Sequence, residues 1–168
     1  KINSASTVTG DKILEAKFTL IPSTDAQYSV KYYKQNITRT GYDEVIADSY
    51  NTTGTINSTV TANAKSYEGF TKNAAISTES GIVASDGSLV LHVYFDRNAY
   101  RITYKVDGAV YATEIGYYGC PYPTVADPAK SGYTFDGWYD GAVKINSAST
   151  VTGDKILEAK FTLIPSTD

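Results

Sequence analysis

The stretch DKILEAKFTL, at residues 154–163, predicts a strand that closes a small β-sheet, because aliphatic and aromatic residues alternate loosely with charged ones. It lies within KINSASTVTGDKILEAKFTLIPSTD at residues 144–168, which is repeated at residues 1–25 without a substitution. The second copy begins 143 residues after the first. This period is far longer than the ~20–50 residues of a solenoid repeat, so it predicts a tandem array whose unit contains self-contained domains. A duplication made during cloning is the alternative.

Strand signals recur between the two copies. Six further strands are expected, at residues 28–33, 44–50, 88–95, 100–106, 109–115 and 133–139. Asp107-Gly108 predicts a two-residue hairpin turn between the strands at 100–106 and 109–115, because a type I′ turn needs positive φ. These elements make the chain mainly β.

The remaining segments are expected to be less regular. Residues 51–59 are interpreted as a polar turn region, and residues 60–67 as a strand end or a short helix. Residues 127–132 have Pro at the first helical position and end on Gly, which favours one helical turn. Residues 12–21 are a further expected strand, so the fold class is mainly β or α+β.

The elements fall into two sets with a short junction. We expect one domain at residues 26–98 and a second at residues 99–168, with residues 1–25 as the closing segment of the preceding unit. Because the boundary near residues 96–99 contains no Gly/Ser-rich linker, the two domains are expected to follow each other closely and to stiffen the array.

Composition excludes several functions. The formal net charge is −3, which leaves no basic surplus to neutralise phosphates, so nucleic acid is not an expected partner. No run of ~18 apolar residues is present, so membrane insertion is not expected. Charged residues make up 20% and hydrophobic ones 42%, as in a folded soluble chain. The sequence contains no Met and no signal peptide or sorting tail, and we expect it to be a piece of a longer protein.

Few residues can carry chemistry. The chain has one His and one Cys, His92 and Cys120, which lie in different expected domains and do not predict a catalytic pair. One Cys cannot form an internal disulfide. The Asp-Gly pairs at residues 86, 107, 136 and 140 are interpreted as turns, and no calcium-loop spacing exists. A carboxylate pair for glycoside hydrolysis is not singled out by any spacing. We expect no enzyme, no metal and no cofactor.

Tyrosine is the unusual residue, with 15 in the chain. One cluster comprises Tyr28, Tyr32 and Tyr33, and a second comprises Tyr111, Tyr117, Tyr118, Tyr122, Tyr133 and Tyr139. Most are expected in core or cross-strand packing, and so is the single Trp138. Tyr117, Tyr118 and Tyr122 are the candidate ligand-binding residues, since exposed rings stack on sugars. A Lys–Asn amide crosslink at Lys31, Lys105 or Lys160 is a further alternative to surface lysines.

The second set resembles the Listeria–Bacteroides repeat, the module of the internalin B-repeat. The matching residues are YRITYKVDGAVYATEIGYYGCPYPTVADPAKSGYTFDGWYD and TVTGDKILEAKF, and GYTFDGWY at 132–139 is their most specific part. The first set resembles, more weakly, a mucin-binding-protein-type repeat through YSVKYYKQ, TANAKSYEGFTKN and GSLVLHVYFDRN. Both resemblances imply a β-grasp-like (ubiquitin-like) domain, a small twisted sheet with a short helix or loop across one face. Cys120 is a departure from such secreted repeats.

The resemblance implies a structural function. We expect a spacer or stalk module of a bacterial cell-surface adhesin-like protein, extracellular and cell-wall associated, whose partners are neighbouring repeat units. The alternative is a binding module for a host glycan or host protein through exposed Tyr. Because residues 144–168 are tethered directly to residues 100–143, we expect this copy to close its own domain. The copy at residues 1–25 is then expected to add to another sheet edge, by strand exchange between molecules.

Overall fold

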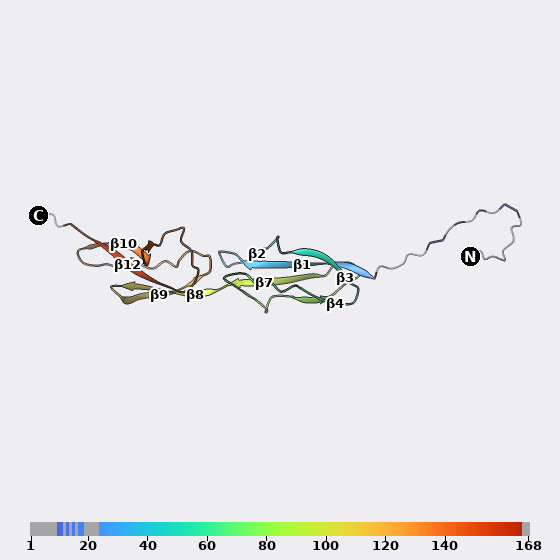
Figure 1. Ribbon diagram of the computed structural model, residues 1–168, viewed down its shortest axis with the longest axis horizontal. Coiled ribbons are helices and arrows are strands. Elements are labelled where there is room, and N and C mark those ends of the chain that lie inside the picture. Colours follow the sequence, from blue (N-terminus) through green and yellow to red (C-terminus); the bar gives the residue numbers. More distant parts are fainter. Residues whose placement is uncertain (1–9, 12, 14, 16, 19–23, 166–168) are drawn as a thin grey trace.

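The computed structural model describes residues 10–11, 13, 15, 17–18 and 24–165. In this part of the chain the fold is all-β, with two mixed five-stranded sheets, one two-stranded sheet and no helix. The two large sheets follow each other along the long axis of the molecule (Figure 1). We call them the N-terminal unit, residues 25–97, and the C-terminal unit, residues 99–163.

The N-terminal unit is built on two long central strands. β1 (Asp25–Gln35) lies parallel to β7 (Val90–Arg97), in a register that runs from Ser29↔Val90 to Lys34↔Phe95. The shorter strands of this unit are β2 (Tyr42–Glu44), β3 (Tyr50–Thr55), β4 (Thr59–Thr61), β5 (Phe70–Lys72) and β6 (Ser80–Ile82). β2 and β3 pair with opposite ends of β1, β5 pairs with β7, and β4 with β6 form the small sheet.

Alternation along β1 and β7 creates the core of this unit. Successive side chains of a strand point to opposite faces, and the register therefore places two buried rows on one face. The core comprises Tyr28, Val30, Tyr32, Val83, Leu91, Val93 and Phe95. The hydroxyl of the buried Tyr32 donates to the Asn63 carbonyl at 2.7 Å, so its polar atom is satisfied.

The C-terminal unit repeats this plan. Its strands are β8 (Ala99–Val106), β9 (Ala109–Tyr117), β10 (Tyr133–Asp140), β11 (Val143–Lys144) and β12 (Lys155–Leu163), in the order β11-β10-β12-β8-β9. β8 and β12 are parallel, and every other neighbouring pair is antiparallel. The strand expected at residues 154–163 is confirmed as β12, which lies between β8 and β10.

The core of the C-terminal unit is smaller. It comprises Ile102, Tyr104, Val151 and Leu157, with Trp138 packed against it. The segments that follow β9 and precede β12 are joined by the Gly119 N–H donating to the Val151 carbonyl at 2.7 Å and by the Val151 N–H donating to the Cys120 carbonyl at 2.9 Å. These two loops complete the core because Val151 comes from one of them.

Three sequence expectations are wrong. Residues 45–49 form a turn rather than the middle of a strand, since the Asp48 and Ser49 N–H groups both donate to the Val45 carbonyl. Residues 51–55, expected as part of the polar turn region at 51–59, lie in β3, where Thr side chains suit a half-exposed strand. Residues 127–132 contain no helical turn in the structure.

A fourth expectation is wrong at Asp136-Gly137. This pair lies inside β10, where the register shifts between Phe135 and Gly137, so it is a bulge and not a turn. Gly137 has φ +142°, and a Cβ there would lie 2.7 Å from the Lys144 Cε. In contrast, Asp107-Gly108 has positive φ at both residues, which confirms the hairpin turn.

The first copy of the repeated segment has a different environment from the second. Most of the expected strand at residues 12–21, and most of the closing segment at residues 1–25, lies outside the described residues. Of the described members, Ile13 and Phe18 are 96% and 93% exposed. The counterpart of Phe18 in the second copy, Phe161, instead lies in β12, with its ring centroid 5.7 Å from that of Phe135.

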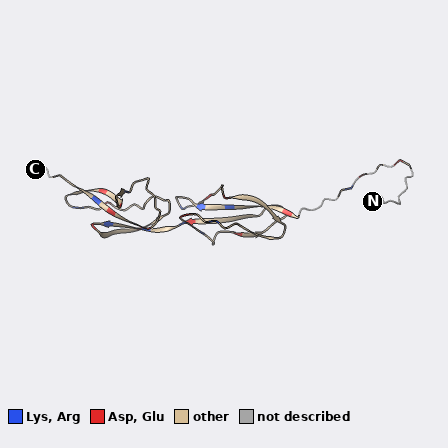
Figure 2. Cartoon of the chain, in the orientation of Figure 1, with Lys and Arg blue, Asp and Glu red and all other residues tan. Residues whose placement is uncertain are grey.

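Positive and negative residues are mixed along the molecule. Figure 2 shows Lys and Arg interspersed with Asp and Glu in both units. Many of them pair, as in Lys31–Glu44 at 3.0 Å and Lys155–Asp140 at 2.6 Å. In the described segments there is no helix that could cross a membrane.

Candidate functional site: the joint between the two units

The two sheets are connected by one residue, Asn98, which is held on three sides. Its N–H donates to the Gly69 carbonyl at 2.8 Å, and its carbonyl accepts from the Tyr118 N–H at 3.0 Å. Its side-chain Oδ1 accepts from the Thr71 hydroxyl at 2.6 Å. The connection is therefore part of the hydrogen-bonded structure of both units rather than a free linker.

Arg97, at the end of β7, reaches across this connection. Its Nη1 donates to the Tyr118 carbonyl at 2.6 Å, and its Nε donates to the Asn36 carbonyl at 3.1 Å. The guanidinium lies 4.9 Å from the centroid of the Phe70 ring. Because Arg is always charged and its planar fork holds several donors at once, this side chain fixes one unit against the other.

The ring of Tyr118 packs directly on the N-terminal unit. A Cβ at Gly69 would lie 2.0 Å from Tyr118 Cγ, so only glycine permits this approach. The ring makes an edge contact with Phe70, with centroids 6.0 Å apart. Desolvation and the neighbouring Glu68 carboxylate raise the pKa of Tyr118 above its ordinary value.

Two further contacts complete the joint. The guanidinium of Arg39 lies 3.6 Å from the centroid of the Tyr117 ring, which is a close cation–π distance. The buried Cys120 thiol lies 3.4 Å from the Ile37 carbonyl, in position to donate a weak hydrogen bond. The loop at residues 36–39 thus contacts the C-terminal unit through both an aromatic face and a thiol.

The candidate ligand-binding tyrosines lie in two places. The structure brings Tyr117 and Tyr118 together in the joint, where Arg39 and Phe70 contact their rings. Tyr122 lies beyond the joint, in a loop over the inner face of the C-terminal sheet. Desolvation raises the pKa of Tyr122, against a smaller opposing effect of Lys155, and the Asp140 carboxylate adds a lesser increase.

The residues considered for catalysis are not assembled into a reactive site. His92 lies among aromatic rings, with centroids 5.7 Å from Tyr33 and 6.3 Å from Tyr94. Cys120 lies in the joint, against Ile37. Within the described residues, no group of three or more His, Cys, Asp or Glu is placed to hold a metal ion.

Two of the three lysines considered for a crosslink, Lys31 and Lys160, have other neighbours. Lys31 pairs with the Glu44 carboxylate, and this contact raises the pKa of Lys31 while it lowers that of Glu44. Lys160 lies 4.1 Å from the centroid of the Tyr139 ring. These contacts are those of strand lysines on a solvated face.

Sequence reasoning missed Arg39, Gly69, Phe70 and Arg97. Except for Arg97, they lie far from the junction in the sequence. None of them is a residue type that marks an interface by itself. The one signal in the sequence was the absence of a linker near residues 96–99, which predicts close contact between the units but not which residues make it.

Comparison with known proteins assigns the C-terminal unit to a family. Residues 100–163 match the Listeria-Bacteroides repeat domain, which confirms the resemblance seen in the sequence. The chain is also 35% identical over 79 residues to Internalin H of Listeria monocytogenes, a match that covers 44% of this chain and 14% of Internalin H. This repeat domain is of the kind found in internalin-type surface proteins. The mucin-binding-type resemblance of residues 26–98 stays a prediction.

Proposed function

We propose that the chain is a tandem-repeat spacer module of a bacterial cell-surface adhesin-like protein, with a structural and non-catalytic role. The observation that carries this proposal is the parallel pairing of the first and last strands in each unit, β1 with β7 and β8 with β12. Tension applied through the chain ends pulls two parallel neighbours along their common axis in opposite directions. The ladder hydrogen bonds between them then bear load together, whereas a hairpin pulled at its open end breaks them one at a time.

The proposed role includes two β-grasp-like domains, at residues 26–98 and 99–168. In both units the first and last strands form the parallel centre, with antiparallel strands added outside. Loops take the place of a helix over the inner face. The joint at Asn98 supports a semi-rigid unit, because it fixes the two domains to each other instead of separating them.

Location and partners belong to the same proposal. The similarity to an internalin supports the proposed extracellular, cell-wall-associated position, and neighbouring repeat units are the proposed partners. The copy at residues 1–25 is proposed to exchange into the sheet of another molecule. Light scattering that finds only monomer at high concentration, with this segment giving random-coil NMR shifts, would contradict the exchange.

The alternative is a binding module for a host glycan or host protein through exposed tyrosines. The contacts of Tyr117 with Arg39 and of Tyr118 with Phe70 favour the spacer, because rings packed in a joint are not free to stack on a ligand. A glycan-array signal that is lost in Tyr117→Ala would favour the alternative.

Single-molecule force spectroscopy tests the spacer directly. Pulling from residues 24 and 165 loads both parallel pairs in shear, and we expect two unfolding events at high force. The matched control pulls the same protein from residues 99 and 117, which face each other at the open end of the β8–β9 hairpin. That geometry unzips antiparallel strands, and we expect a clearly lower force. Equal forces in the two geometries would refute the mechanical role.

A further inference from the structure

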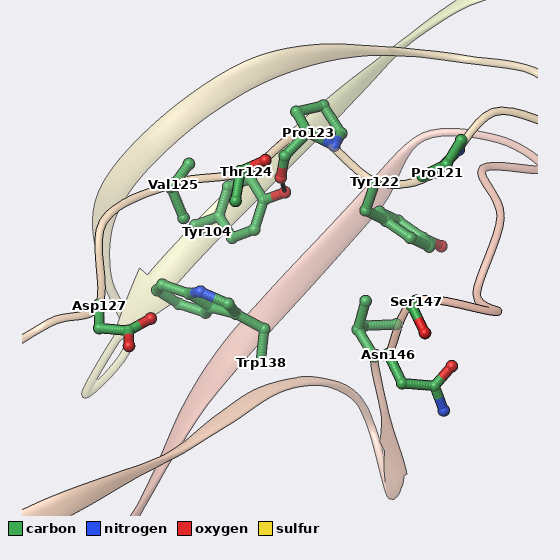
Figure 3. Close-up of a pocket in the computed structure, with 11 residues that line it drawn as sticks. Tyr104, Pro121, Tyr122, Pro123, Thr124, Val125, Asp127, Trp138, Asn146 and Ser147 are labelled. Carbon is green, nitrogen blue, oxygen red and sulfur yellow. Dashed lines mark hydrogen bonds between the residues drawn. The ribbon is translucent and has the colours of Figure 1, made fainter.

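A pocket lies in the C-terminal unit beyond the joint. Its volume is about 220 Å³, and it opens between the loop after β9 and the loop before β12 (Figure 3). Its lining includes the aromatic side chains of Tyr104, Tyr122 and Trp138 and the polar side chains of Asp127, Asn146 and Ser147. Ligand sites are typically concave and mostly apolar, with a few polar groups that fix orientation.

The aromatic wall of this pocket is held in place by its neighbours. Trp138 makes an edge contact with Tyr104, with ring centroids 4.9 Å apart, and a tilted contact with Tyr111 at 5.8 Å. The hydroxyl of Tyr104 donates to the Pro123 carbonyl, which ties the pocket floor to its proline-containing loop. A wall fixed in this way loses little conformational freedom when a ligand binds.

One polar atom of the wall is unsatisfied. The indole Nε1 of Trp138 is buried and has no hydrogen-bond partner among the described residues. Because this atom is closed to solvent, a ligand in the pocket meets the ring of Trp138 rather than its N–H group.

Polar side chains surround the aromatic wall. In Figure 3 the Trp138 indole projects into the pocket with Asp127 on one side and Asn146 and Ser147 on the other. Asp127, Asn146 and Ser147 are exposed, so they form the rim and not the floor. A carboxylate, an amide and a hydroxyl around an aromatic face match the chemistry of a sugar, whose ring hydroxyls both donate and accept while its C–H face packs on a ring.

We propose that this pocket binds one neutral sugar residue, which packs against Trp138 and Tyr122 and whose hydroxyl group donates a hydrogen bond to the Asp127 carboxylate. The volume lies below the ~300–1,000 Å³ of pockets for drug-sized ligands, which limits the occupant to a single ring. An apolar peptide side chain fills such a space as well, but it forms no hydrogen bond with the polar rim. The proposal goes beyond the spacer role and takes up only Tyr122 of the three candidate tyrosines.

The single Trp makes the site self-reporting. Trp138 is the only tryptophan in the chain, so its emission follows the pocket without a label. The intact protein is titrated with methyl glycosides of glucose, galactose, mannose and N-acetylglucosamine, and binding is checked by saturation-transfer NMR. We expect saturable, millimolar binding of at least one glycoside, with a change in Trp138 emission.

Two single-residue variants test whether the sugar binds in this pocket. Asp127→Asn removes the charged acceptor and is expected to weaken binding about tenfold, as for the loss of a hydrogen bond to a charged group. Tyr122→Leu is expected to weaken it similarly by removing an aromatic face. The matched control is Asp43→Asn, because Asp43 is exposed on β2 of the N-terminal unit and takes no part in the pocket. Near-ultraviolet circular dichroism of each variant establishes that its fold is retained.

Three results would overturn the proposal. The first is no saturable binding of any glycoside by either method. The second is binding that Asp127→Asn and Tyr122→Leu leave unchanged, since the sugar then binds elsewhere. The third is binding of proline-rich peptides but of no glycoside, which would reassign the pocket to a protein partner.

Discussion

Gly69→Ala is expected to uncouple the two units while leaving each of them folded. Gly69 has φ +74°, and its added Cβ would lie 2.0 Å from Tyr118 Cγ and 2.1 Å from Cδ1. A contact this short cannot be relieved by a small shift, so the Tyr118 ring must leave the N-terminal unit. Movement of Tyr118 also draws its carbonyl away from Arg97 Nη1.

The structure supplies a matched control in Gly87→Ala. Gly87 has φ +73°, and the nearest atom to its added Cβ is the Gln27 carbonyl oxygen at 3.6 Å. Both variants therefore carry the same left-handed strain, of about 1–2 kcal/mol per residue. Only Gly69→Ala also displaces Tyr118, so the difference between the two variants isolates the joint.

The expected difference is the energy of the contacts that Tyr118 loses. The edge contact with Phe70 contributes about 0.5–1.5 kcal/mol beyond burial. The hydrogen bond from the charged Arg97 contributes about 1.5–3 kcal/mol. We therefore expect Gly69→Ala to lower the free energy that couples the two units by about 2–4 kcal/mol more than Gly87→Ala does.

Two measurements report whether the two units remain coupled. In ¹⁵N relaxation the units of the native protein and of Gly87→Ala should tumble as one anisotropic body, whereas those of Gly69→Ala should tumble separately. Cys120 is the only cysteine and lies buried in the joint, so its reaction with a thiol reagent should be slow in the native protein and faster in Gly69→Ala. If Gly69→Ala matches Gly87→Ala in both measurements, the joint does not couple the units.

Three other predictions follow from separate features. Phe161→Ala removes a half-buried ring that contacts Phe135 and should lower the free energy of unfolding by about 1–3 kcal/mol. Phe18 is 93% exposed, so Phe18→Ala should change the free energy of unfolding by less than about 0.5 kcal/mol. Equal effects of the two variants in urea denaturation would contradict the pairing of β12. Burial raises the pKa of Tyr32 and of Tyr104 from 10.0 to about 12. Because the unfolded chain loses these protons at a lower pH than the folded chain, the free energy of unfolding should fall as the pH rises from 10 to 12. A urea midpoint that stays constant over that range would be inconsistent with the burial of these two rings. Leu157→Ala truncates a fully buried side chain and should cost about 2–5 kcal/mol by thermal or chemical unfolding, and a cost below about 1 kcal/mol would show that the core of the C-terminal unit is not built on β12.

Long strands were predictable because their signals are local. Residues 88–95 carry a continuous β-branched and aromatic run, and they lie almost wholly within β7. Asp107-Gly108 specifies its turn through backbone geometry alone. Residues 45–49 carry a similar apolar signal, but hydrogen bonds to the Val45 carbonyl and the pairing of Asp48 with Lys65 and Tyr67 hold them as a turn. Such partners are distant in the sequence, so no local pattern shows them.

The candidate site was less predictable than the fold. Tyr117 and Tyr118 were singled out as tyrosines in a cluster, but their contacts come from Arg39, Gly69 and Phe70, which no spacing connects to them. The residues of the joint are thus defined by the way two sheets meet. Trp138 shows the opposite case, because a lone large ring in a small domain is expected to pack against the core, and it does.

The repeated segment shows most directly why local sequence is insufficient. Phe18 and Phe161 occupy the same position in identical 25-residue stretches, yet one ring is almost fully exposed and the other contacts Phe135. Intrinsic strand propensity is the same for both copies and cannot distinguish them. The difference comes from β8 and β10, which are connected to the second copy through a short chain and present it with two ladders at high effective concentration. In a tandem array every copy has such a body immediately before it, so the same physical rule that closes the C-terminal unit closes each unit in turn.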